Sequence, residues 1–385
     1  MYQLYILIVL ILGSVTVEAN PINEIYNSEK HQRGNALCEA SDGGWLIGGY
    51  SKTAGSKRGD FLILRTDQAG SVQWQLELGE KSRDEECFAV VQLGEVEWLI
   101  AGSQWRSNKR KPGKEVTGIV HAITDSGVVQ WSQEIRDVEI RGAALVQDRV
   151  CLTGATRGGL AWLCLMNKTG EILWTKTDFP GDSSHIRDLA VLSDTSIALV
   201  GYQRLDGETS STAWCAVVNM SGELVAQARS GTPDDFFRSV ACRNGEIVCG
   251  GASGTRVFFN GARIFNSFVL RLDAQCTPLD SLRLVSDGFD IIQDLALTDT
   301  TVICTGIASV DPMSPDFRKG VLGLSLTRNL EIRWNAGQPG IRRGAARAIL
   351  PTDEGFIIAG LTEQGVPSSV SNVLLLSVSA DRGAH

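Results

Sequence analysis

Histidine and metal-binding motifs are scarce in this sequence. Its 385 residues include four histidines and nine cysteines, with no Cys-x-x-Cys pair and no Cys/His spacing typical of a zinc site. His-Glu-x-x-His, Gly-x-Ser-x-Gly and phosphate-loop motifs are absent as well. We therefore expect no bound metal and no cofactor. Enzymes that assemble their sites from distant segments also lack such local motifs.

Basic residues are fewer than acidic ones. Lysine and arginine number 36 against 44 acidic residues, which gives a net charge of −8 and an isoelectric point near 5.2. Nucleic-acid binding needs a basic surface, so we expect no nucleic-acid partner. An anionic membrane surface is not expected as a partner either.

Long apolar segments are limited to residues 4–13, a run too short to cross a bilayer as a helix. Val17-Glu18-Ala19 follows, with small residues at the positions that a signal peptidase reads, so residues 1–19 are predicted to be a signal peptide. The segment before the run contains no Lys or Arg, which leaves an uncleaved anchor as the alternative. We expect a secreted or periplasmic protein with no stable membrane insertion after cleavage.

The cysteines follow the pattern of buried hydrophobic residues. Their number is odd, and Cys151, Cys249 and Cys304 lie inside apolar strand patterns. A free cysteine in such a place behaves as a small apolar side chain. We predict that most of the nine are buried and unpaired, although disulfides are permitted outside the cytosol.

Glycine is abundant, with 41 residues, and it marks an internal repeat. A short apolar strand that ends in glycine recurs seven times, at intervals of roughly 50 residues. A period of this length with several strands and no helix signal is typical of one propeller blade. We predict an all-β fold, a seven-bladed β-propeller of four-stranded antiparallel blades, as a single domain over residues 20–385. The terminal glycines are Gly49, Gly102, Gly154, Gly201, Gly251, Gly306 and Gly360.

The two ends of the chain are predicted to share one blade. Each repeat contains four strands, called here a to d from the inside of the ring outward. The seventh repeat ends after its strand c, at residues 372–378, whereas residues 22–27 precede the first strand a. We expect the N-terminal segment to supply the missing strand d, because pairing the two ends removes exposed sheet edges.

The repeats resemble a broad class of exported propeller repeats. They share Gly-Gly-(aromatic)-(aliphatic)-(aliphatic)-(Ala/Gly)-Gly in strand b and Asp-x-x-Gly-x-x-x-Trp before strand d, as at Asp67–Trp74 and, with Asn first, at Asn167–Trp174. The resemblance covers nearly all of residues 22–378. The repeats are also distantly similar to those of quinoprotein (pyrroloquinoline quinone) dehydrogenases and of outer-membrane assembly propellers, which usually carry eight blades. The resemblance implies that the tryptophans dock one blade on the next and do not bind a cofactor.

The irregular connections are expected to gather on one face of the ring. The a–b and c–d turns are tight, whereas the d–a and b–c connections are long, as at residues 252–267. Function concentrates on variable loops held by a rigid scaffold, so we expect a site on the d–a and b–c face. Phe258, Phe259 and Phe265 in this connection either grip a partner or a sugar, or pack on the face, and burial is the favoured interpretation.

Arginine recurs near the start of strand a. When these strands are aligned on an alanine, the position three residues earlier is arginine in five of the seven repeats and polar in all of them. The fold would bring these side chains to the mouth of the channel, where guanidinium groups match carboxylate, sulfate or phosphate. An unidentified anionic small molecule, glycan or protein is the expected partner. The candidate ligand-binding residues are Arg33, Glu86, Arg141, Arg187, Arg238, Gln293 and Arg343.

Two interpretations of this arginine pattern stay open. A feature repeated in every blade is also typical of a structural role, in which each arginine bonds loop carbonyls or a neighbour such as Asp188 or Asp294. For the whole chain we expect a monomeric, non-enzymatic binding or scaffold propeller. The alternative is a propeller enzyme, a lyase or hydrolase acting on an extracellular anionic glycan or polymer, with Glu86 and His185 as the nearest candidate side chains. A quinone-dependent dehydrogenase would need a calcium-ligand cluster that is not visible in the sequence.

Overall fold

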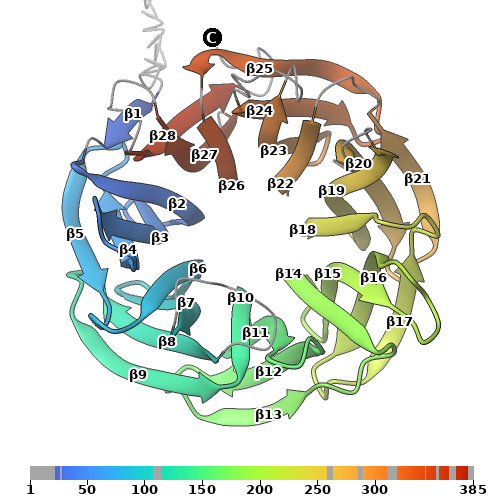
Figure 1. Cartoon of the computed structure of the whole chain (residues 1–385), viewed down its shortest axis with the longest axis horizontal. Helices are drawn as coiled ribbons and strands as arrows, with labels where there is room; N and C mark the ends of the chain where they lie inside the picture. Colours follow the sequence, from blue (N-terminus) through green and yellow to red (C-terminus); the bar gives the residue numbers. More distant parts are fainter. Residues whose placement is uncertain are drawn as a thin grey trace, which may run out of the picture.

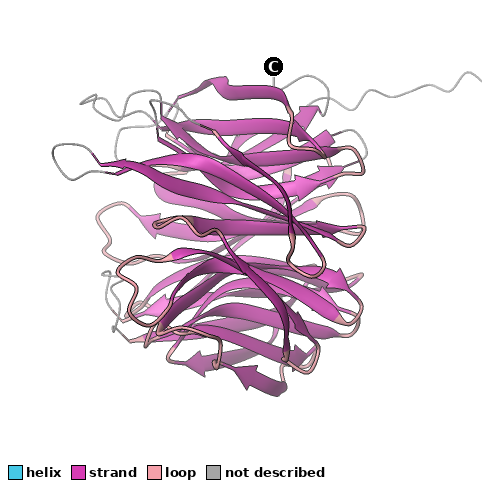
Figure 2. Ribbon diagram, turned by 90° about the vertical axis from the view of Figure 1, so that its right-hand side faces the viewer, coloured by secondary structure: helices cyan, strands magenta, loops and turns pink. Residues whose placement is uncertain are grey.

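The computed structural model describes residues 22–26, 28–106, 115–257, 263–284, 289–309, 319–342, 344–352, 355–363 and 370–379. The predicted signal peptide, residues 1–19, lies outside these ranges. Every regular element in the described part of the chain is a β-strand (Figure 2). Accordingly, these ranges contain no helix long and apolar enough to span a membrane.

Seven four-stranded antiparallel sheets are arranged as a ring around a common axis (Figure 1). Blade 1 contains β2 (Lys30–Glu39), β3 (Trp45–Thr53), β4 (Asp60–Thr66) and β5 (Val72–Leu78). Blade 2 contains β6 (Asp84–Gly94), β7 (Glu97–Trp105), β8 (Val116–Thr124) and β9 (Val129–Arg136). Blade 3 contains β10 (Val138–Val146), β11 (Arg149–Thr156), β12 (Ala161–Asn167) and β13 (Ile172–Lys176). Blade 4 contains β14 (Ser183–Ser193), β15 (Ser196–Arg204), β16 (Thr212–Asn219) and β17 (Leu224–Arg229).

The remaining blades follow the same order. Blade 5 contains β18 (Phe236–Arg243), β19 (Glu246–Val257), β20 (Arg263–Asp273) and β21 (Pro278–Arg283). Blade 6 contains β22 (Phe289–Leu297), β23 (Thr301–Ser309), β24 (Lys319–Thr327) and β25 (Ile332–Arg342). Blade 7 contains β26 (Gly344–Thr352), β27 (Gly355–Thr362), β28 (Asn372–Ser379) and β1 (Asn23–Tyr26). The seven-bladed propeller predicted from the glycine repeat is confirmed.

The N-terminal strand closes the ring, as predicted. β1 pairs antiparallel with β28, and Asn23 lies opposite Leu376 (Figure 1). The amide of Ser377 donates to the carbonyl of Ile22 at 2.9 Å, and the amide of Ile22 donates to the hydroxyl of Ser377 at 2.8 Å. The seventh sheet thereby has four strands like the other six, with β26 as its inner strand and β1 as its outer strand.

The glycine that ends each strand b faces a β-bulge in strand a. In blade 4, Ile186 pairs with Gly201 and Asp188 pairs with Val200, so Arg187 is the extra, bulged residue. A β-carbon on Gly201 would overlap the carbonyl oxygen of His185. The same overlap, with the carbonyl two residues before the bulge, occurs at the equivalent glycine of every blade. The repeated glycine is therefore required by the close approach of the bulged strand.

The blades pack on one another through seven apolar clusters, each shared by two adjacent blades. At their outer edge the indole of Trp74 donates to the carbonyl of Asp125 in the next blade at 2.7 Å, and Trp174 donates to that of Met220 at 3.2 Å. These tryptophans dock blade on blade, as the resemblance implied.

All nine cysteines are free, which confirms the prediction that most are unpaired. Seven of them are buried, and Cys38 and Cys242 are half-buried. Cys215, Cys249 and Cys276 lie in the apolar cluster between blades 4 and 5.

Candidate functional site

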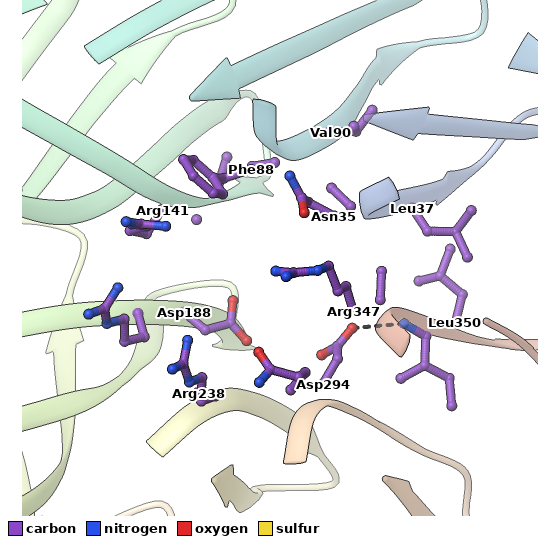
Figure 3. Close-up of a pocket in the computed structure, with 18 residues that line it drawn as sticks. Asn35, Leu37, Phe88, Val90, Arg141, Asp188, Arg238, Asp294, Arg347 and Leu350 are labelled. Atoms are coloured by element: carbon purple, nitrogen blue, oxygen red, sulfur yellow. Dashed lines mark hydrogen bonds between the residues drawn. The ribbon is translucent and has the colours of Figure 1, made fainter. Parts of the chain in front are cut away.

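The seven bulged residues meet around one central cavity of about 230 Å³ (Figure 3). Each comes from the strand a of a different blade, because the bulge turns that residue out of the ladder and toward the channel. The rigid ring thus presents seven side chains from segments roughly 50 residues apart. The bulged residues are Asn35, Phe88, Arg141, Arg187, Arg238, Gln293 and Arg347.

The alignment on alanine was wrong for three blades. It places Arg141, Arg187, Arg238 and Gln293 correctly at the bulge, but Arg33 and Glu86 lie two residues before it. Arg343 lies outside the described residues, and the bulged residue of blade 7 is four positions later. The reason is that the alanine used as a marker follows the bulge at different distances. It comes directly after the bulge in blades 1 and 2, three residues after it in blades 3 to 6, and directly before it in blade 7.

Arg33 and Glu86 form an ion pair between blades 1 and 2. The Nη2 and Nε atoms of Arg33 lie 2.7 and 2.8 Å from Oε1 of Glu86, and the Asn35 amide donates to the same oxygen at 2.8 Å. Glu86 is buried, and Arg33 also stacks over the ring of Tyr50. For these two residues the contacts match the structural interpretation, and neither lines the central cavity.

Arg141 is paired within its own strand. Its guanidinium group bonds the carboxylate of Glu139 and lies 4.2 Å from the centre of the Phe88 ring. Glu139 therefore compensates the charge of Arg141 on the wall of the cavity.

Arg187 and Arg238 have aromatic neighbours in place of carboxylates. Arg187 donates to the hydroxyl of Tyr202 at 3.3 Å, and the guanidinium carbon of Arg238 lies 5.2 Å from the centre of the Phe236 ring. Neither arginine has an ion-pair partner among the described residues, and the buried Nε of Arg238 has no hydrogen-bond partner there. Burial and then the charges of Arg187 and Arg347 lower the pKa of Arg238 to about 10. Positive charge is therefore concentrated on this side of the cavity without full compensation.

Two carboxylates, Asp188 and Asp294, lie directly after bulged residues and line the same cavity (Figure 3). Asp188 accepts the amide of Val240 in blade 5 at 2.9 Å, and Asp294 accepts that of Ile349 in blade 7 at 2.8 Å. The hydroxyl of Ser239 donates to Asp294 at 2.5 Å. Burial raises the pKa of both carboxyls, and the charge of Asp188 raises that of Asp294 further.

The sequence interpretation treated these two aspartates only as neighbours of the arginines. The signal was an acidic residue directly after the bulged position in blades 4 and 6, in Arg187-Asp188 and Gln293-Asp294. Asn35, Phe88 and Arg347 were missed as well, and the alignment error accounts for all three.

His185 lies beside the arginines and behind Tyr202. Their rings stack with centres 4.9 Å apart. Burial, followed by the charges of Arg187 and Arg141, lowers the pKa of His185 to about 4. At neutral pH the imidazole is therefore uncharged and adds nothing to the positive charge of the cavity.

Metal binding finds no support in this arrangement. Across the described residues, no group of three or more His, Cys, Asp or Glu side chains has the geometry to hold an ion. The two cavity aspartates are instead engaged by backbone amides and Ser239.

Comparisons with known proteins find the fold but no family. No protein-family model matches this chain, and no curated protein does. The structure is similar to that of Chaetomium thermophilum Sqt1, with 13% identity, 93% of this chain and 85% of that chain covered, and a TM-score of 0.51. It is also similar to Drosophila Plexin A, solved in complex with Semaphorin 1b, with 8% identity, coverage of 92% and 86%, and a TM-score of 0.52.

A third match is the β-propeller domain of the Trilobed protease from Pyrococcus furiosus, described as having an open velcro topology. It has 9% identity, coverage of 91% and 94%, and a TM-score of 0.49. The similarity to Sqt1 and Plexin A indicates a shared fold, and at these identities it carries no function across.

Proposed function

We propose that this chain is an exported binding propeller that holds an anionic ligand in its central cavity. The ligand lies against Arg141, Arg187, Arg238 and Arg347, which line the cavity from four blades. Guanidinium groups present fixed donors to the oxygen atoms of carboxylate, sulfate and phosphate.

The observation that carries the proposal is the pair Arg187 and Arg238. Both are half-buried on the cavity wall, and among the described residues neither has a carboxylate partner. A partly buried charge without an ion-pair partner costs stability, and the contacts with Tyr202 and Phe236 do not neutralise it. An anion that bound both groups would supply the missing partner.

The aspartates of the cavity do not take this role. Asp188 and Asp294 hold backbone amides of the neighbouring blades, and their pKa values are raised. Carboxylates in close ion pairs with arginine would instead have lowered pKa values. The arginines of blades 4 and 5 therefore stay available to a ligand.

Thermal denaturation with added anions tests the proposal. We expect sulfate, phosphate or citrate to raise the midpoint, since a ligand at about 100 times its Kd adds about 2.7 kcal/mol. The rise should shrink at high salt. An Arg187→Met/Arg238→Met variant should lose this response and, without anions, be at least as stable as the wild type, because two unpaired charges are removed.

Arg149→Met/Arg243→Met is the matched control, because it removes the same charge from exposed positions near the a–b turns of blades 3 and 5. It should respond to anions like the wild type. If no anion shifts the midpoint and the cavity variant is the less stable protein, the arginines are structural and the proposal fails.

Catalysis on an acidic polymer is the second candidate function, and one observation favours it. Asp188 and Asp294 have raised pKa values in the cavity that also contains the arginines. A carboxyl group with a raised pKa is suited to general acid catalysis, while arginine would neutralise an acidic substrate. Cleavage of polyuronates or sulfated polysaccharides that is lost in Asp294→Asn would support this function, and no cleavage by the wild type would dismiss it.

Export and a monomeric state are proposed from the sequence. The support is the apolar segment with its cleavage pattern in residues 1–19, together with the resemblance of the repeats to exported quinoprotein-like propellers. A mature protein that begins at Asn20 by mass spectrometry, with the light-scattering mass of one chain, is the expected result.

A further inference from the structure

A second cavity, of about 240 Å³, adjoins the central one on the side of blades 4 and 5. It is called the side pocket here. It shares Arg187 and Arg238 with the central cavity, so the two unpaired guanidinium groups stand between the two spaces. The other lining residues are Tyr202, Ser211, Asp234, Asp235, Phe236 and Phe265.

Three half-buried aromatic rings form the apolar part of the side pocket. Phe236 and Phe265 meet edge to face with centres 5.4 Å apart, and Tyr202 is backed by the stacked imidazole of His185. Arg187 and Arg238 lie over Tyr202 and Phe236 respectively. These contacts hold the rings in place, while their remaining exposed surface faces the pocket.

A few hydrogen-bonding groups accompany the rings. Asp235 is buried and held by Arg283, with Nη2 2.7 Å from Oδ2 and Nη1 3.1 Å from Oδ1. Ser211 and Asp234 lie beside it, and the amide of Asp234 donates to the carbonyl of Ser211 at 2.7 Å. Aromatic walls with a small number of fixed polar groups are typical of small-molecule sites.

The volume limits the ligand to a small one. Pockets for drug-sized ligands measure roughly 300–1,000 Å³, so the side pocket takes about one ring. The ring has to carry an anionic group toward Arg187 and Arg238, and hydroxyl groups toward Ser211 and Asp234. Its body has to pack against the parts of the three aromatic rings that line the pocket. An acidic sugar in its pyranose form meets all three requirements.

We propose that the side pocket binds the ring of an acidic sugar, with the sugar carboxylate held between Arg187 and Arg238. This assignment rests on the proposed anion-binding function and names the ligand class for it. The carboxylate then reaches the edge of the central cavity between the two arginines, and the rest of that cavity receives the next residue if the sugar is the end of an acidic glycan.

Calorimetric titration of the intact protein separates the contributions of ring and charge. Glucuronate should bind about tenfold more tightly than glucose, which lacks the charge, and than acetate, which lacks the ring. Phe265→Leu, which removes the ring packed on Phe236, should weaken glucuronate binding by about fivefold, the usual contribution of an aromatic contact, and leave sulfate binding unchanged. Phe236→Leu and Tyr202→Leu should weaken glucuronate binding at least as much, because these rings also contact the two arginines. A glucuronate trimer distinguishes a glycan end from a free acid. The trimer binds more tightly than the monomer only if the site takes the end of a glycan.

Trp131→Leu is the matched control, because Trp131 is a half-buried ring at the outer edge between blades 2 and 3 and lines neither cavity. It should bind glucuronate like the wild type, and denaturation midpoints establish that each variant folds. If glucuronate and acetate bind alike and the side-pocket variants change nothing, while sulfate still binds, the sugar assignment fails and the anion site stands. If sulfate does not bind either, both fail.

Discussion

Arginines at equivalent positions of this ring have different partners because the residue two positions earlier on the same strand differs. In blade 3 that residue is Glu139, which pairs with Arg141. In blade 4 it is the uncharged His185, and Arg187 bonds Tyr202. In blade 5 it is Phe236, whose ring lies beside Arg238. The residue type two positions before the arginine thus decides whether a carboxylate on the same strand neutralises the guanidinium charge. The function proposed for the cavity depends on this local difference.

The pH dependence of stability follows from the cavity aspartates. Because burial and Asp188 raise the pKa of Asp294, the folded protein keeps a proton that the unfolded chain releases above its usual pKa of about 3.9. Stability is therefore full below that value and falls as the pH rises through the raised pKa. We expect Asp294→Asn to flatten the slope of the unfolding free energy between about pH 4 and pH 7, measured by urea denaturation.

The slope is compared, and not the absolute stability, because asparagine also changes the hydrogen bond to Ile349. Asp188 and Glu85, whose pKa values are raised by burial, keep part of the slope in the variant. Asp299→Asn is the control, since Arg243 lowers the pKa of Asp299 and its contribution changes only at lower pH. Equal slopes in the wild type and Asp294→Asn would show that this carboxyl titrates normally.

At the scale of the element, the bulge and the glycine opposite it act as one unit. The bulge aims a side chain at the channel, and the carbonyl two residues before it occupies the space that a β-carbon would need in strand b. The repeated glycine in strand b is therefore easy to recognise in the sequence, whereas the side chain that reaches the cavity belongs to the bulged residue of strand a. The glycine is the better anchor for aligning these blades.

Substitution of one such glycine tests this arrangement. We expect Gly201→Ala to lower the free energy of unfolding by about 3 kcal/mol, because the new methyl group collides with the backbone of His185 and either strand has to shift. Gly158→Ala is the control, since its β-carbon would approach nothing nearer than the Thr156 hydroxyl at 3.7 Å. Urea denaturation measures both, and similar losses in the two variants would contradict the steric explanation.

At the scale of the whole molecule, closure of the ring holds the cavity together. Each apolar cluster joins two neighbouring blades, and the cluster between blades 7 and 1 includes Ile22 and packs against Tyr26. Because seven blades each contribute one side chain, the cavity keeps its geometry only while every interface is formed. A short N-terminal strand therefore stabilises a site that it does not touch.

Removal of that strand is the corresponding prediction. A chain that begins at Ser28 should lose several kcal/mol of stability relative to one that begins at Asn20, because it exposes the edge of β28 and loses the β1 ladder. Thermal denaturation gives the stability, and light scattering reports the aggregation expected of an open edge. Identical midpoints for the two chains would show that the ring closes without β1.

The blade count, the closure by residues 22–27 and the unpaired cysteines were all predictable from the sequence. Each depends on local patterns: apolar alternation, turn residues and a glycine that recurs with every blade. Four of the seven bulged residues in the cavity, including Arg187 and Arg238, were predictable for the same reason. The other three were not, because no residue type in strand a marks where the bulge lies.

What the sequence by itself determined is therefore the scaffold, since a blade is built from neighbours within about 50 residues whose pairing follows their own order. Only the tertiary structure decided which arginines are compensated, that Asp188 and Asp294 share a cavity with them, and that a side pocket lies between blades 4 and 5. The physical reason is that these features depend on the register of each bulge and on contacts between blades. The glycine of strand b marks the bulge within each blade, whereas the contacts between blades are set by packing around the whole ring and leave no periodic signal in the chain.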